Sequence, residues 1–108
     1  MLFSSALIGT ALFALQADPT RGPRDAYTAC LRQFMERSAN ARMSESDFTA
    51  ALPQQCSPQE QAFREAIRRR EAGYRTPAGE IDQIITDELA DARTNIREIF
   101  AMSTTPRS

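Results

Sequence analysis

The sequence contains no histidine, no tryptophan and no lysine. Histidine is the usual general base near neutral pH and the commonest transition-metal ligand, so its absence excludes Ser-His-Asp and Cys-His catalysis. The four glycines are isolated from one another, which excludes a glycine-rich phosphate-binding loop. The two cysteines are too far apart for a CxxC redox motif or a CxxCH haem site. We therefore predict no enzyme activity and no cofactor.

An excess of charge of one sign is also missing. The chain has 13 basic residues, all arginine, against 14 acidic residues, which gives a net charge of -1. No overall field would draw it to nucleic acid or to an anionic membrane, and we expect no nucleic-acid partner. With 108 residues, 42% of them hydrophobic and only four of them glycine, the composition predicts one globular domain that favours helix over sheet.

Residues 1–17 form an apolar run without a charged side chain. The run is shorter than the roughly 20 residues of a membrane span, and it ends in alanine, as secretory signal peptides do. We predict a signal peptide over 1–17, cleaved after Ala17 or, as a second choice, after Ala14. A domain over 18–101 and a flexible tail over 102–108 would follow, in a periplasmic or secreted protein. The alternative is an uncleaved N-terminal anchor, which would be the protein's one contact with the membrane.

Cys30 and Cys56 are the only cysteines. Paired cysteines in an exported protein usually form a disulfide, which predicts one intrachain bond between them. In the chain-entropy model, closing a loop of this length stabilises the fold by about 3.5 kcal/mol. A reactive thiol pair is the alternative interpretation.

Apolar periodicity and capping signals predict three long helices and one short helix. The long ones are expected over 23–41, 58–72 and 77–101, with Gly73 ending the second and Thr76 capping the third. The short helix is expected after Ser44, as N-cap with Asp47 at the third position, and is expected to end at Pro53. Ser57 is expected to cap the second long helix in a capping box with Glu60. The fold class is therefore all-α: a small helical bundle with one disulfide after a signal peptide.

Steps of three and four residues place the apolar positions of each helix on one stripe. The residues expected to face the core are Ala26, Tyr27, Cys30, Leu31, Phe34, Met35 and Ser38, then Phe48, Ala51 and Leu52, then Ala62, Phe63, Ala66 and Ile67, and finally Ile81, Ile84, Ile85, Leu89, Ala92, Ile96, Ile99 and Phe100.

A cluster of five arginines is the strongest candidate for a binding site. Its members are Arg64, Arg68, Arg69, Arg70 and Arg75. One interpretation is a solvated helix face, because Glu60, Glu65 and Glu71 each stand four residues before one of them. The other is a patch for an anion or an acidic partner, with the unpaired cations that phosphate contacts need. Arg70 lies on the apolar stripe, so its stem should pack while its head reaches solvent or an acid.

Three acidic residues of the last helix are candidates for a metal site or for acid-base chemistry. Asp87 and Asp91 share a helix face, with Glu88 beside them. No EF-hand loop or Glu-x-x-His motif accompanies them. Acidic residues in the first half of a helix are usually solvated, so we predict no metal site.

Three segments carry a resemblance to other proteins: Ala29-Cys30-Leu31-Arg32, the stretch from Phe48 to Cys56, and Ala62-Phe63-Arg64. Over residues 25–101 the chain resembles a group of small exported two-cysteine helical proteins of alphaproteobacterial type with no assigned function. The resemblance implies a secreted helical domain and transfers no functional residue.

The leading functional hypothesis is a non-enzymatic exported protein, periplasmic or secreted, that binds or supports an envelope protein. The first alternative is a periplasmic stress chaperone, because the acidic side chains would lose their charge below about pH 4 and leave the chain strongly positive. The second alternative is a carboxylate-based enzyme.

Overall fold

The computed structural model describes residues 18–104, and these residues contain four α-helices and no strand. The helices are α2 (Arg21–Asn40), α3 (Glu45–Ala51), α4 (Ser57–Gly73) and α5 (Ala78–Thr104), and a 3-10 turn, η2 (Leu52–Gln54), lies between α3 and α4. The predicted all-α class of three main helices and one short helix is confirmed. The predicted signal peptide at 1–17 lies outside the described residues, as do positions 105–108 of the predicted tail.

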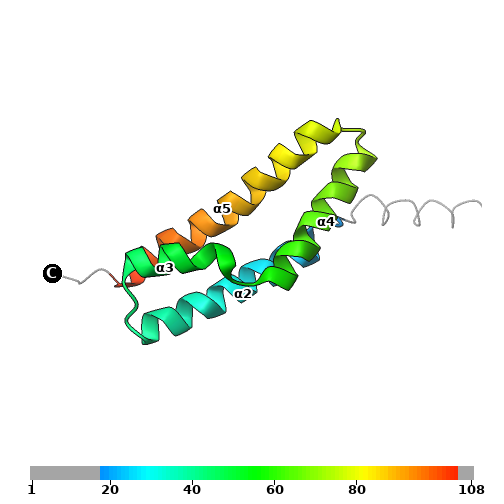
Figure 1. Cartoon of the computed structure of the whole chain (residues 1–108). Helices are drawn as coiled ribbons and strands as arrows, with labels where there is room; N and C mark the ends of the chain where they lie inside the picture. The colour runs from blue at the N-terminus through cyan, green and yellow to red at the C-terminus, as the bar shows by residue number, and fades with distance from the viewer. Residues whose placement is uncertain (1–17, 105–108) are drawn as a thin grey trace, which may run out of the picture.

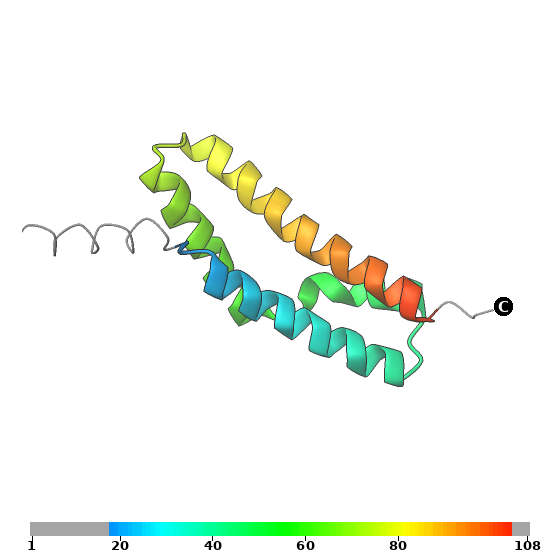
Figure 2. The same ribbon diagram turned by 180° about the vertical axis from the view of Figure 1, so that it is seen from behind.

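The helices form a bundle of three arms: α2, the segment from α3 through η2 to α4, which we call the middle arm, and α5 (Figure 1). The chain runs along α2, returns through α3 and α4, and reverses again into α5, which therefore runs in the same direction as α2. Figure 2 shows the same arrangement from behind, with α3 lying against the last part of α5. The middle arm is thus a single path divided into α3 and α4. Its two pieces cover different halves of α5.

The break in the middle arm lies between Leu52 and Ser57. The α-helix ends at Ala51, and the chain continues through Pro53 in the 3-10 turn η2. The direction then changes at Cys56, which has φ 65° and ψ 38° in the left-handed region. A residue with a Cβ adopts that region at a cost of about 1–2 kcal/mol, so other interactions must hold this turn in place.

The disulfide supplies one of these interactions. The Sγ atoms of Cys30 and Cys56 are 2.00 Å apart, and the Cα–Cα distance is 6.0 Å. The predicted pairing is therefore confirmed, across a sequence separation of 26. It fixes the break in the middle arm to the centre of α2. The loop that it closes contains the second half of α2 and all of α3.

The core follows the predicted stripes with two exceptions. Its fully buried members include Tyr27, Leu31, Phe48, Leu52, Phe63, Ile67, Ile85, Leu89, Ile96 and Phe100. The predicted inward positions Ala26 and Ala62 are exposed instead, because each lies at the edge of its stripe and faces away from the neighbouring helix. Ser38 is buried as expected, and its hydroxyl has no hydrogen-bond partner among the described residues.

Three phenylalanines stack where α2, α3 and α5 meet. The ring of Phe48 lies 5.3 Å from that of Phe34, with an interplanar angle of 13°. On its other side it lies 4.0 Å from Phe100 at 11°. Each arm contributes one ring, so this stack joins the three arms at one end of the bundle.

The helix starts differ in part from the predictions. Ser44 caps α3 as expected, since its Oγ accepts the N–H of Asp47 at 3.0 Å. Ser57 is instead the first residue of α4, and Cys56 occupies the N-cap without a side-chain cap hydrogen bond, so the predicted Ser57 cap is wrong. Thr76 donates its hydroxyl to Glu71, and α5 begins at Ala78. At its other end α5 continues to Thr104, beyond the predicted start of the flexible tail.

Candidate functional site

The five arginines of the predicted cluster do not form one patch. Helical spacing places Arg64 and Arg68 on one face of α4, one turn apart. Arg70 lies on the side of α4 that faces α5, where it contacts Glu88. Arg75 follows the helix in a turn and has φ 61°. The structure therefore divides the cluster into a bridge, an inter-helix network and exposed members.

The bridge joins α4 to α5 through one carboxylate. Glu60 accepts from Arg64 Nε at 3.0 Å and, through its other oxygen, from Arg93 Nη2 at 2.6 Å. Arg93 also donates from Nε to the Tyr27 hydroxyl at 3.1 Å. Burial raises the pKa of Tyr27, and the nearby Arg93 opposes this rise. Glu60, expected to complete a capping box, instead pairs with two arginines, and Arg93 connects it to Tyr27 of α2.

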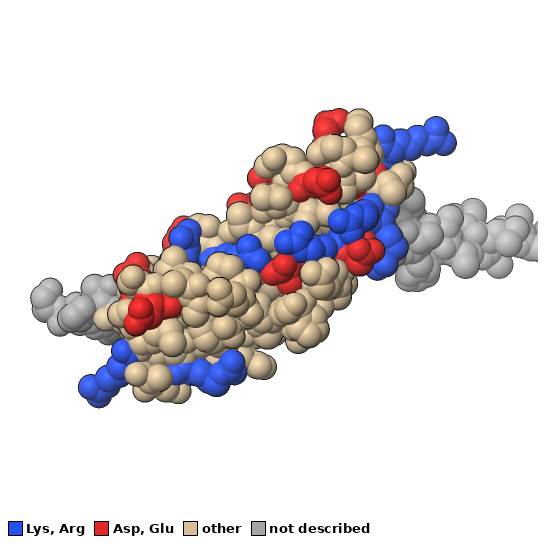
Figure 3. Space-filling view, viewed as in Figure 1, with Lys and Arg blue, Asp and Glu red and all other residues tan. Residues whose placement is uncertain are grey.

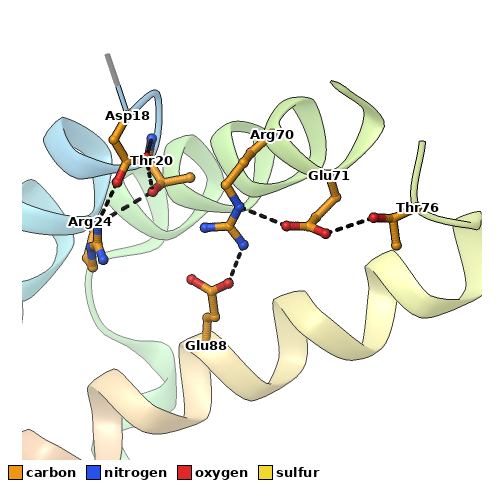
Figure 4. Close-up of polar contacts among 7 residues, drawn as sticks. All are labelled: Asp18, Thr20, Arg24, Arg70, Glu71, Thr76 and Glu88. Carbon is orange, nitrogen blue, oxygen red and sulfur yellow. Dashed lines mark hydrogen bonds and ion pairs between the residues drawn. The ribbon is translucent and has the colours of Figure 1, made fainter. Parts of the chain in front are cut away.

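The inter-helix network surrounds Arg70 (Figure 4). Its guanidinium donates to Glu71 at 2.8 Å and to Glu88 of α5, and Glu71 also accepts from the Thr76 hydroxyl at 2.9 Å. Hydrogen bonds from Arg70 and Thr76 lower the pKa of Glu71. The hydrogen bond to Glu88, and after it the bond to Glu71, raise the pKa of Arg70, and burial opposes this rise. The head of Arg70 was expected to reach solvent or an acid, and it reaches Glu71 and Glu88. Its contacts therefore connect α4 to α5 near the turn between them.

The remaining arginines of the cluster are exposed. Arg68 pairs with Glu65 on the surface, whereas the predicted pairs Glu65–Arg69 and Glu71–Arg75 do not form. Within residues 18–104, neither Arg69 nor Arg75 has an ion pair. These two guanidiniums therefore carry charge that no acidic side chain pairs with in the described part of the chain.

The acidic residues of α5 differ in their contacts. Asp87 accepts from the Gln83 amide at 2.8 Å, and Glu88 is held by Arg70. Glu88 and Asp91 both line a shallow depression of about 310 Å³, together with Arg24 and Asn95. In the part of the chain that the structure describes, no three His, Cys, Asp or Glu side chains are grouped so that they could hold a metal ion.

A second group of arginines lies where the middle arm is broken. Figure 3 shows basic side chains in a band along the junction between α5 and the middle arm. A groove of about 230 Å³ opens here between η2 and α5. Its η2 side is formed by Thr49, Leu52 and Pro53, and its α5 side by Ala90, Arg93, Thr94 and Arg97. We call it the η2–α5 groove.

The sequence did not predict Arg93 and Arg97 as site residues, because they are distant in the sequence from the five clustered arginines. A signal for Arg93 was present, since it stands four residues after Leu89 and three before Ile96, at the edge of the apolar stripe of α5. The fully buried Tyr27 also required a partner for its hydroxyl. The position of Arg97 beside η2 depends on how the helices pack, so no sequence signal would have shown it.

Comparison with known proteins gives no match: no family model, no curated protein and no solved structure is similar to this chain. The resemblance to exported two-cysteine helical proteins stays a prediction. Of the helices between residues 18 and 104, none has the length and apolar character needed to cross a membrane. The disulfide indicates an oxidising location outside the cytoplasm.

Proposed function

We propose that this chain is an exported, non-enzymatic binding protein that recognises another protein of the cell envelope, in the periplasm or after secretion. One observation carries the proposal: a disulfide-bonded scaffold presents arginines that its own acids leave unpaired. The disulfide supports an oxidising compartment. Arg69, Arg75 and Arg97 support a binding role, since none of them has an ion pair within residues 18–104.

The location is tested by an intact mass of the protein recovered from its native host, with and without reductant. We expect a chain that begins at Asp18 and gains the mass of two hydrogens on reduction. A mass that retains Met1 together with free thiols would contradict export.

The binding role is tested by photo-crosslinking in the envelope of the native host. A photoreactive residue replaces an exposed neighbour of these arginines in the full chain, at Ala72, Tyr74 or Glu98, and Gln33 or Glu36 on exposed positions of α2 in matched controls. We expect the positions beside the arginines to give a discrete adduct with one protein, identified by mass spectrometry. Adducts from the α2 positions alone would support a binding function but contradict the arginine surface as its site. No adduct from any position would contradict the binding role.

The periplasmic stress chaperone stays an alternative prediction. It requires suppression of client aggregation below about pH 4, where acidic side chains are protonated, and no suppression at neutral pH. The carboxylate-enzyme hypothesis has a separate test. That hypothesis requires that replacing Asp87 and Asp91 together by asparagine changes an enzymatic activity of the protein. The two residues have different contacts in the structure.

A further inference from the structure

The η2–α5 groove combines an apolar floor with a cationic rim. Leu52 is buried beneath it, and Pro53 and Ala90 present exposed apolar surface on opposite sides. Arg93 and Arg97 stand one helical turn apart on α5 and border the same space. The groove lies beside α5 at the point where the middle arm changes direction.

The two rim arginines are not equivalent. Arg93 forms an ion pair with Glu60 and donates a hydrogen bond to the Tyr27 hydroxyl, so its charge is already paired within the protein. Arg97 is exposed and donates only to the Thr94 hydroxyl, at 3.2 Å. It has no acidic partner among residues 18–104. A guanidinium beside an apolar floor is complementary to a carboxylate that stands next to an apolar side chain.

Among the described residues that line the groove, two are arginines and none is acidic. The nearby face of α4 carries Arg64 and Arg68, and the bridge through Glu60 joins Arg64 to Arg93. Glu60 is therefore shared by two arginines, and Glu65 pairs with Arg68. Figure 3 shows the basic side chains along the junction, with acidic side chains at the edge of the band. An acidic partner would approach this face with favourable electrostatics.

The size of the groove favours a peptide over a small molecule. Its volume of about 230 Å³ is below the range of about 300–1,000 Å³ that is usual for small-molecule pockets. It suits one apolar side chain of a longer segment, with the neighbouring residues lying across the surface.

We propose that the η2–α5 groove is the docking site for an acidic segment of the partner protein, in which an apolar side chain enters the groove and an adjacent carboxylate pairs with Arg97. The inference rests on the proposed binding function and specifies its surface. The carboxylate would form charge-assisted hydrogen bonds with the Arg97 guanidinium, which can donate two parallel bonds to it. Arg93 keeps its bonds to Glu60 and Tyr27 and forms part of the groove wall.

The test uses the disulfide-bonded protein and three capped synthetic pentapeptides. The first has one leucine flanked by glutamates, the second replaces the glutamates with glutamines, and the third replaces the leucine with glycine. Binding is followed by two-dimensional amide NMR. We expect the first peptide to shift amides of Thr49, Leu52 and residues 90–97, and the other two to bind at least about tenfold more weakly, since one loses the charge-assisted bonds and the other the apolar contact.

Two variants and one control locate the site. Arg97→Gln removes the rim charge at an exposed position, and Ala90→Phe fills the groove from its exposed wall. Both should weaken the first peptide about tenfold or more without lowering the unfolding midpoint. Arg37→Gln removes an exposed charge at the end of α2, outside the groove, and should leave binding unchanged.

Equal affinity of the first peptide for the wild-type protein and for Arg97→Gln would overturn the proposal, as would shifts confined to other surfaces. Inorganic phosphate or anionic phospholipid vesicles that bind at the groove as well as the acidic peptide would also overturn it, in favour of a simple anion site. The two proposals fail separately. A partner crosslinked only from the positions beside Arg69 and Arg75 would support the binding function and reject this groove.

Discussion

At the end of the bundle where α2, α3 and α5 meet, Phe34, Phe48 and Phe100 stack face to face. At the other end, α4 and α5 are joined through Arg70, and its partner Glu71 is the one charged residue that is buried among residues 18–104. We call these the aromatic end and the ion-paired end. The disulfide lies between them, at the break in the middle arm.

The two ends should respond differently to their surroundings. Stacked aromatic rings lose their contacts only when the helices separate, and neither pH nor salt acts on them directly. Ion pairs depend on the charge of their carboxylates and weaken as salt screens them. The aromatic end should therefore determine global stability, while the ion-paired end makes the α4–α5 turn sensitive to conditions.

The largest expected effect is at the aromatic end. Phe48→Ala removes a fully buried ring that contacts two others, and it should lower the free energy of unfolding by about 3–5 kcal/mol. Urea unfolding followed by circular dichroism measures this loss. Tyr74→Ala is the control, since Tyr74 is 72% exposed and should change stability by less than about 0.5 kcal/mol. Similar losses for the two variants would show that the stack is not the main contributor.

The disulfide should rank next. Joint replacement of Cys30 and Cys56 by alanine should lower the free energy of unfolding by about 3.5 kcal/mol, because the unfolded chain regains the entropy of an open loop. The loss should match that caused by a reductant in the wild-type protein. If reduction leaves the urea midpoint unchanged, the left-handed turn at Cys56 is held by other contacts.

Breaking the ion-paired end should have a smaller effect. In a double-mutant cycle with Arg70→Met and Glu88→Gln, we expect a coupling of about 1–3 kcal/mol, which decreases in high salt. The exposed pair Arg68–Glu65 is the matched control, with an expected coupling of about 0.2–1 kcal/mol. Equal couplings would mean that partial burial adds nothing to the Arg70 contact.

The smallest expected effect is the pH dependence due to Glu71. Its pKa in the folded protein is lowered from the usual 4.5, so its contribution is complete well above that value. As pH falls below 4.5 and through the lowered folded pKa, Glu71 takes up a proton and the contribution is lost. Glu71→Gln should therefore make the decrease in stability below pH 4.5 less steep. An unchanged pH profile in urea titrations would remove Glu71 as a cause.

The sequence predicted the helices well because their ends carry local chemical signals. Pro53, Ser44 and Gly73 each lie within two residues of an observed helix boundary, and only one disulfide was possible with two cysteines. The left-handed turn at Cys56 was not predictable, since a residue with a Cβ has no local preference for that region.

The candidate site was predictable only in part for the same reason. Helix spacing indicated that the head of Arg70 would reach solvent or an acid, but it did not identify Glu88 of α5 as its partner. The contact between Glu60 and Arg93 joins two helices whose relative rotation comes from packing. The η2–α5 groove likewise exists only once the break in the middle arm is placed against α5.

Native-state hydrogen exchange on the disulfide-bonded protein compares the two ends most directly, because it reports the opening free energy at individual amides. We predict that amides near Phe48 in α3 and Phe100 in α5 exchange only through global unfolding. Amides from Arg70 to Ile84, at the ion-paired end, should open at lower free energy, and the gap should widen in high salt. Equal protection at both ends, or earlier opening at the aromatic end, would contradict the account.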